Sequence, residues 1–315
     1  MSDRTKPWTA ELIPSQSGRR VLITGANAGI GFETARKLAR KGAEIVLPAR
    51  SMAKAVDAID RIRREIPSAS LIPGVLDLAS QASVRDFASW FSTQYPGPSL
   101  DLLINNAGVM AIPKRELTVD GFERQFATNF LGPFALTALL YPHVGQREGN
   151  RIVIVSSSVT KRAKIDFNNL QSEHRYRPMS QAYGQSKLAD SLFALELQRR
   201  LTRAGSPVIV TSAHPGYAIT NLQTSGPGTG LSPLRIVSAI LKPLLSHDAA
   251  HGALPTLFAA VAPEAVPGGY YGPDGLFELK GYPKTVLIPT QAQDPRDAEH
   301  LWSKAEILTG IAFRI

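Results

Sequence analysis

The chain has 315 residues, of which 43% are hydrophobic and 19% charged, which is typical of a globular protein and excludes a disordered one. Thirty-five lysines and arginines against 26 aspartates and glutamates give a formal net charge of +9. The absence of cysteine excludes disulfides, thiolate metal sites and a cysteine nucleophile.

The basic residues lie in short groups along the chain, without a long basic run, so we expect no nucleic-acid partner. The first 18 residues are polar and contain Pro7 and Pro14, unlike a signal peptide. The longest apolar stretches fall short of the ~20 residues that span a bilayer. The sequence therefore predicts a cytoplasmic protein with no membrane span.

Short apolar runs alternate with longer helical segments in chain order. The predicted strands are 20–24, 44–47, 70–76, 100–105, 151–156 and 208–212, and the predicted helices are 29–41, 51–66, 84–95, 121–141 and 181–203. This alternation predicts the α/β class: a doubly wound, Rossmann-type parallel sheet of about seven strands, with helices on both faces. The run 270–272 fits a last buried strand or a wall of the ligand pocket equally well.

We expect a single domain over residues 18–282, preceded by an N-terminal arm (1–17) and followed by a C-terminal extension (283–315). The segment 221–242 is rich in glycine and proline and follows the sixth predicted strand. In such folds, ligands bind at the carboxyl ends of the strands. We therefore predict a substrate lid at about 217–245.

A glycine-rich turn follows the first predicted strand. Gly25, Gly29 and Gly31 have the spacing Gly-x-x-x-Gly-x-Gly and lead directly into a helix. Glycine allows the backbone to approach a phosphate, and the free N–H groups of a helix start attract it. This position predicts a dinucleotide site, with further contacts from Asn27 and Ile30.

The end of the second predicted strand indicates which dinucleotide binds. NAD-binding chains place a carboxylate there to accept the ribose 2′-hydroxyl, but this chain reads Leu-Pro-Ala-Arg-Ser up to Ser51. Arg50 instead offers a planar donor to a 2′-phosphate. The sequence therefore predicts that NADP(H) is preferred over NAD(H).

Tyr183 and Lys187 are four residues apart at the start of a predicted helix, which puts them on one helix face. An ammonium stabilises a nearby phenolate and lets the tyrosine give or take a proton. Three serines, 156–158, end the fifth predicted strand at the ligand-binding edge of the sheet. One of them could donate a hydrogen bond to a carbonyl oxygen beside the tyrosine.

The histidines carry no predicted catalytic role, and no metal site is predicted. His247 and His251 are four residues apart, but no third ligand accompanies them. We expect His214 to pack beside the segment 215–216.

These motifs resemble the short-chain dehydrogenase/reductase family over nearly the whole chain. The Asn-Asn-Ala-Gly sequence at 105–108 stands in the family's order between the glycine turn and the Tyr-x-x-x-Lys pair. The resemblance implies catalytic roles for Asn129, Ser157, Tyr183 and Lys187. It implies further cofactor contacts by Asp77, Leu78, Asn105, Ala107, Gly108, Tyr183, Lys187, Pro215, Gly216 and Thr220.

Within the family, the residues 165–170, 182–189 and 214–216 resemble the retinol dehydrogenase-like group, which also includes carbonyl reductases. The resemblance implies interconversion of a ketone or aldehyde and an alcohol, with Tyr183 as general acid or base. The apolar residues of the predicted lid suggest a lipophilic small-molecule substrate. A non-catalytic, NADP-binding regulator on the same fold is the alternative, and either a monomer or a homodimer is expected.

Overall fold

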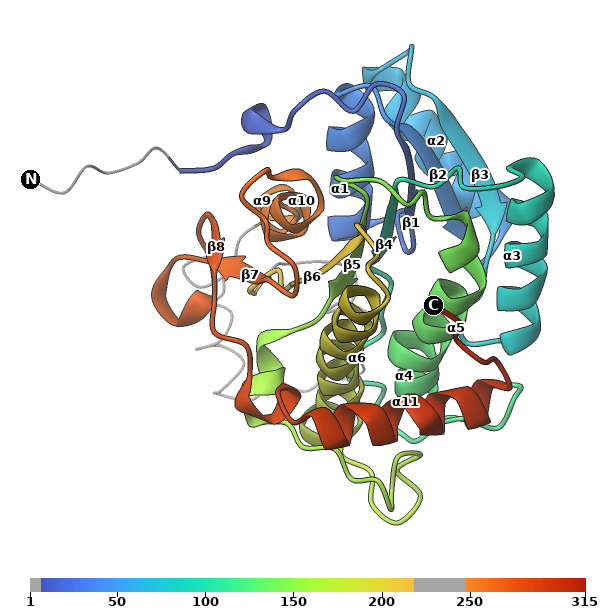
Figure 1. Cartoon of the computed structure of the whole chain (residues 1–315), viewed down its shortest axis with the longest axis vertical. Coiled ribbons are helices and arrows are strands. Elements are labelled where there is room, and N and C mark those ends of the chain that lie inside the picture. Colours follow the sequence, from blue (N-terminus) through green and yellow to red (C-terminus); the bar gives the residue numbers. More distant parts are fainter. Residues whose placement is uncertain (1–6, 218–247) are drawn as a thin grey trace, which may run out of the picture.

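A computed structural model describes residues 7–217 and 248–315, and the chain forms one layered α/β unit over them (Figure 1). Eight strands form a single sheet in the order β3-β2-β1-β4-β5-β6-β7-β8. Their bounds are β1 Arg20–Ile23, β2 Glu44–Ala49, β3 Leu71–Val75, β4 Leu102–Asn105, β5 Arg151–Val155, β6 Ile209–Ala213, β7 Tyr270–Pro273 and β8 Pro283–Thr285. All neighbours pair in parallel except β7 and β8. The predicted doubly wound sheet is therefore confirmed.

Helices cover both faces of the sheet (Figure 1). One apolar core joins it to α1 (Gly29–Arg40), α2 (Met52–Glu65) and α10 (Leu254–Val261), with the short α9 (Ala249–Gly252) beside α1. A second core, on the opposite face, joins it to α3 (Gln81–Gln94), α5 (Gly132–Leu140), α6 (Gly184–Arg203) and α11 (Pro295–Thr309). Burial on both faces explains why the central strands are continuous apolar runs without alternation.

The sheet has eight strands where the sequence predicted about seven. The additional strand, β8, follows β7 after a short loop and pairs with it antiparallel, as a hairpin connection requires. At the opposite edge, β3 contains Pro73, which an edge strand tolerates because one side of it has no partner. The run 270–272 forms β7, with Tyr270 and Tyr271 both buried.

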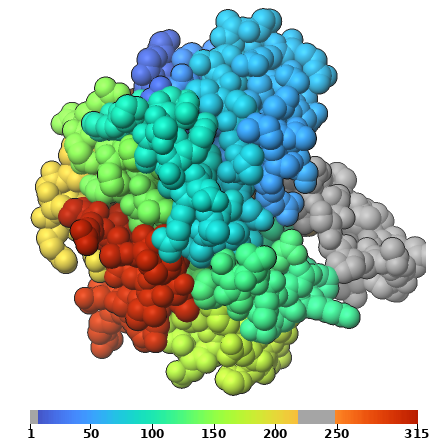
Figure 2. Space-filling model, turned by 90° about the vertical axis from the view of Figure 1, so that its right-hand side faces the viewer, coloured from blue at the N-terminus to red at the C-terminus, as the bar shows by residue number. Residues whose placement is uncertain are grey.

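The predicted C-terminal extension packs closely on the rest of the molecule. Trp302 of α11 stacks on Phe313 with ring centroids 4.9 Å apart, and it meets Phe134 of α5 edge to face at 5.2 Å. Arg200 of α6 lies over the same indole. Figure 2 shows the red C-terminal segment lying against the green and teal parts of the chain. The last 33 residues thus contribute to the core that holds α6 in place.

Two helices that were predicted as continuous contain π-helical turns. The predicted helix 121–141 is divided into α4 (Arg124–Phe126), a π-helical turn at Ala127–Leu131 and α5. The predicted helix 181–203 begins instead with a π-helical turn at Pro178–Tyr183, followed by α6. Such turns are rare and often occur at functional sites. Here they carry Asn129 and Tyr183.

Candidate active site

A cavity of about 1070 Å³ opens at the carboxyl ends of the parallel strands. The chain order reverses between β1 and β4, which is the point where doubly wound sheets bind their ligands. The cavity is lined by residues that follow β1, β2, β3, β4, β5 and β6, together with the start of α6 and the loop between β7 and β8. The volume is at the upper end of the roughly 300–1000 Å³ that is typical of small-molecule and cofactor sites.

The glycine turn between β1 and α1 forms one wall of this cavity. Gly25 and Gly29 have φ angles of 68° and 57°, in the left-handed region that favours glycine. A methyl group on Gly31 would lie 2.4 Å from Nδ2 of Asn106, so no side chain fits there. Asn106 Nδ2 also donates to the carbonyl oxygen of Thr24 at 2.9 Å. Gly29, Ile30 and Gly31, at the start of α1, line the cavity, and a helix start is a favourable position for an anion.

The cavity wall near β2 carries two cations and no carboxylate. Arg50 follows β2, and Lys54 lies one turn later in α2; both are exposed and line the cavity. Asp77 and Leu78, which follow β3, also line it, as do Asn27 and Ile30. A phosphate group could be held between Arg50 and Lys54.

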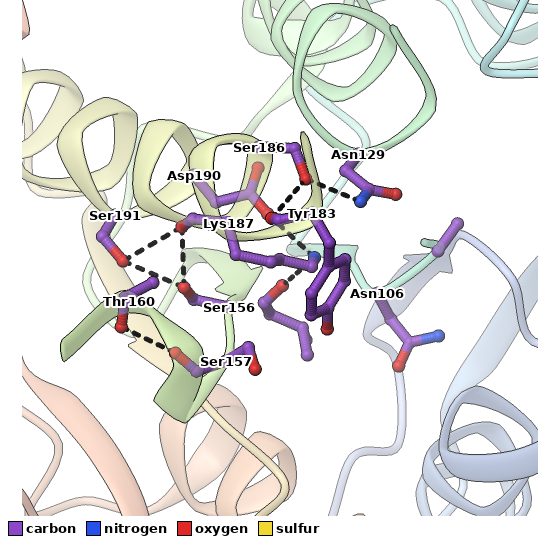
Figure 3. Close-up of polar contacts among 12 residues, drawn as sticks. Asn106, Asn129, Ser156, Ser157, Thr160, Tyr183, Ser186, Lys187, Asp190 and Ser191 are labelled. Atoms are coloured by element: carbon purple, nitrogen blue, oxygen red, sulfur yellow. Dashed lines mark hydrogen bonds and ion pairs between the residues drawn. The ribbon is translucent and has the colours of Figure 1, made fainter. Parts of the chain in front are cut away.

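Tyr183, Lys187 and Ser157 line the same cavity (Figure 3). The ammonium of Lys187 donates to the carbonyl oxygen of Val155 at 2.8 Å and to Oδ2 of Asp190 at 2.9 Å. Lys187 and Asp190 are both buried, with side chains 6% and 3% exposed. The tyrosine, the lysine and the serine therefore come together as the sequence predicted.

The three consecutive serines differ in their surroundings. Ser156 is buried and donates to the carbonyl oxygen of Lys187 at 2.9 Å, while its Oγ lies 2.9 Å from that of Ser191 (Figure 3). Ser157 is less buried, and its Oγ accepts a long hydrogen bond, 3.4 Å, from the backbone of Val159. Ser156 thus fixes β5 to α6, whereas Ser157 has a hydroxyl available to a ligand.

The two asparagines predicted to act at the site, Asn105 and Asn129, are not among the residues that line the cavity. Asn129 is buried; it accepts from the Val109 N–H at 2.7 Å and donates to the Val109 carbonyl at 2.9 Å and to Ser186 Oγ at 2.8 Å. Asn105 is also buried and donates to Thr137 Oγ1 at 2.9 Å. Asn129 holds the backbone that follows β4, whose Ala107 and Gly108 do line the cavity, and Asn105 ties the end of β4 to α5.

The buried charges shift the pKa values of the lysine and its partner. Burial lowers the pKa of Lys187, but Asp190 and Tyr183 more than compensate and raise it above its ordinary value. Burial also raises the pKa of Asp190 to about 6, although the ammonium opposes this. The lysine thus keeps its positive charge beside the tyrosine at neutral pH.

The remaining predicted residues follow β6, and the structure describes only some of them. Pro215 and Gly216 line the cavity. Thr220 and nearly all of the predicted lid, 217–245, lie outside the described residues. His214 is fully buried and contacts the segment 215–216, as expected, because its Nδ1 accepts a hydrogen bond from the Gly216 N–H.

Sequence reasoning missed Lys54, Asp190 and Phe277. Lys54 follows Arg50 by one helical turn, and Asp190 follows Lys187 by three residues, so both spacings could have revealed them. Phe277 lines the cavity from a loop that had no signal in the sequence.

Comparison with known proteins identifies the family. The family model described as short chain dehydrogenase matches residues 19–227. The chain belongs to the short-chain dehydrogenase family. It is 40% identical over 307 residues to a mouse polyprenol dehydrogenase, covering 95% of this chain and 86% of that protein. It is 40% identical over 299 residues to human retinol dehydrogenase 13, covering 93% and 85%.

Solved structures share the fold of this chain. A protein of Mycobacterium paratuberculosis superposes with a TM-score of 0.80 at 39% identity, covering 98% of this chain and 100% of that one. A short chain dehydrogenase from Burkholderia cenocepacia, solved with NADP, shares the fold at 24% identity and a TM-score of 0.60, covering 81% and 96%. This chain is therefore an oxidoreductase of the short-chain dehydrogenase family, similar to the retinol dehydrogenases.

Two kinds of feature are absent from residues 7–217 and 248–315. No helix there is both long and apolar enough to cross a bilayer. Within the same ranges, no three histidine, aspartate or glutamate side chains gather in a way that could hold a metal ion.

Proposed function

We propose that this short-chain dehydrogenase interconverts a ketone or aldehyde and an alcohol, with NADP(H) as its preferred cofactor and Tyr183 as general acid or base. The observation that carries the proposal is the convergence of Tyr183, Lys187 and Ser157 on the cavity that also contains the glycine turn. A proton donor, a cation and a hydroxyl thus face the space beside a dinucleotide site. This arrangement has the parts needed for hydride transfer to a carbonyl group.

The cofactor preference rests on the charges at the end of β2. Arg50 and Lys54 both line the cavity there, and neither Pro48 nor Ala49 offers an acceptor side chain to a ribose hydroxyl. A 2′-phosphate would bind two positively charged side chains here, whereas the 2′-hydroxyl of NAD(H) would find no carboxylate to accept its hydrogen bond. Asp77 and Leu78 would border the adenine, and the start of α1 would hold the pyrophosphate.

When bound, the reduced nicotinamide supplies a hydride to the carbonyl carbon. Tyr183 donates its phenolic proton to the carbonyl oxygen as negative charge develops on it. The hydroxyl of Ser157 donates a hydrogen bond to the same oxygen and orients the carbonyl group. In the oxidation direction, the tyrosine phenolate takes the proton from the alcohol.

Lys187 stabilises the phenolate that remains after proton donation. Its ammonium is held in place by the carbonyl of Val155 and the carboxylate of Asp190, on the inner side of the cavity wall. Asn129 fixes the backbone at Val109, and a methyl group on Gly108 would lie 3.5 Å from the lysine Nζ. We propose that Asn129 positions this wall and a water molecule that carries protons to Lys187.

The cavity favours a lipophilic substrate. Met179, Tyr217 and Leu279 add apolar surface to the cavity wall near Tyr183 and Gly216. The relatives named polyprenol dehydrogenase and retinol dehydrogenase carry names of lipophilic alcohols, which supports the same substrate class.

The test is a panel of carbonyl compounds assayed with each cofactor. Oxidation of NADPH and of NADH is followed by absorbance with short and long aldehydes, aryl ketones and sterols. We expect turnover with the larger apolar carbonyls and a kcat/KM at least tenfold higher with NADPH. The absence of turnover on every compound, with cofactor binding intact, would contradict the proposal and favour a non-catalytic NADP-binding protein.

A further inference from the structure

The loop between β7 and β8 (Figure 1) contributes an aromatic side chain to the cavity lining. We call residues 275–281 the rim loop. Within it, Phe277 lines the cavity and its surface is 78% exposed. The preceding Leu276 is similarly exposed, at 74%, but does not line the cavity. The loop thus presents two exposed apolar side chains, of which one faces the ligand space.

The rim loop has a backbone conformation that its sequence does not favour. Phe277 and Glu278 have φ angles of 53° and 57°, in the left-handed region that residues with a side chain rarely adopt. Two such residues in succession persist only where surrounding contacts determine them. Contacts made by Glu278 and by the neighbouring residues of the loop hold this conformation.

The carboxylate of Glu278 ties the rim loop to both sides of the site. Its Oε1 lies 2.7 Å from Nζ of Lys161, in the turn that follows Ser157. Its Oε2 lies 2.9 Å from Nε2 of His214, which directly precedes the segment 215–216. The bond to His214 and the charge of Lys161 hold the pKa of Glu278 down at about 2, so the carboxylate is ionised at neutral pH.

The two ring nitrogens of the buried His214 have different hydrogen-bonding roles. The Gly216 N–H donates to Nδ1 of His214 at 3.3 Å, so the hydrogen of the neutral ring is on Nε2 and is donated to Glu278. A second link comes from the backbone, where the Tyr217 N–H donates to the carbonyl oxygen of Leu279 at 2.7 Å. The rim loop is therefore fixed directly on the backbone that follows β6.

We propose that Phe277 is a specificity-determining residue, which contacts the apolar part of a bulky carbonyl substrate, and that Glu278 is the positioning residue that holds it there. The proposal rests on the proposed function, because it assigns the substrate side of the same cavity. The exposed phenyl ring, which lines the same cavity as Met179 and Tyr217, offers its face to an alkyl chain or a ring system. A small aldehyde held at Tyr183 would offer little apolar surface for such a contact.

The test compares Phe277→Ala with Leu276→Ala as the matched control. Both changes shorten an exposed apolar side chain in the rim loop, but only the first removes a cavity wall. Steady-state kinetics are measured with decanal and with propanal at saturating NADPH, and the NADPH Kd is measured by nucleotide fluorescence. We expect Phe277→Ala to lower kcat/KM for decanal about tenfold more than for propanal, whereas Leu276→Ala changes the two substrates equally.

Glu278→Gln distinguishes positioning from catalysis. We expect this variant to raise KM for decanal without lowering kcat, because the proton donor is untouched while the ring loses its fixed place. If the wild type is active but Phe277→Ala and Leu276→Ala have the same preference for decanal over propanal, the inference about the rim loop is overturned and the proposed function is not. A wild type that turns over neither these aldehydes nor any other carbonyl would overturn the proposed function and, with it, this inference.

Discussion

Removing the carboxylate of Asp190 should destabilise the protein strongly, because it leaves the ammonium of Lys187 buried without a counter-charge. The change Asp190→Ala removes one partner of an ion pair whose side chains are 6% and 3% exposed. Losing one partner of such a pair typically costs about 3–5 kcal/mol. The lysine keeps its hydrogen bond to Val155, so we expect the lower end of this range, about 3 kcal/mol.

An exposed ion pair provides the control for this prediction. Asp57 and Arg61 are four residues apart on α2, 3.5 Å from each other, and the aspartate side chain is 66% exposed. Asp57→Ala should therefore change stability by less than about 1 kcal/mol. The assay is urea unfolding at pH 7.5, followed by circular dichroism, for the wild type and both variants. An Asp190→Ala variant within about 1 kcal/mol of the wild type would refute the argument that this pair is buried and interdependent.

Three further predictions concern the cofactor site and the rim loop. Gly31→Ala should abolish NADPH binding in a fluorescence titration, because the methyl group would lie 2.5 Å from the backbone carbonyl oxygen of Gly25 and displace the turn. Arg50→Ala should raise the Kd for NADPH about tenfold and leave that for NADH within twofold, with Lys54→Ala giving a smaller effect in the same direction. Glu278→Gln should lower stability at pH 7, where the ionised carboxylate with its depressed pKa contributes fully. The difference in free energy of unfolding between this variant and the wild type should become smaller as the pH falls from 4.5 towards about 2. Urea titrations over this pH range measure it. A difference that stays constant with pH would contradict the ion pairs of Glu278.

Much of the architecture could be predicted because its signals are local. Buried parallel strands require continuous apolar runs, and the turn after β1 requires glycine at Gly25, where φ is 68°. The pair Tyr183 and Lys187 follows from helical spacing alone. The strand β8 has only three residues and depends on its pairing with β7, so no pattern in the sequence indicates it.

The orientation of the asparagines could not be derived from the motif itself. Successive side chains on a strand point to opposite faces, so Asn105 and Asn106 cannot both reach the same partner. The structure turns Asn105 to Thr137 and Asn106 to Thr24. The placement of Phe277 depends on tertiary contacts that overcome an unfavourable backbone conformation, which no local preference predicts.

The measurement that tests the central claim most directly is the activity of Tyr183→Phe, with Tyr95→Phe as a control that lies outside the cavity. Both variants are assayed for NADPH-dependent reduction of the best carbonyl substrate and for NADPH binding. We predict that Tyr183→Phe lowers kcat by about a hundredfold or more while the NADPH Kd stays within about threefold, and that Tyr95→Phe behaves like the wild type. A Tyr183→Phe variant that keeps near-normal turnover would contradict the assignment of this tyrosine as the proton donor.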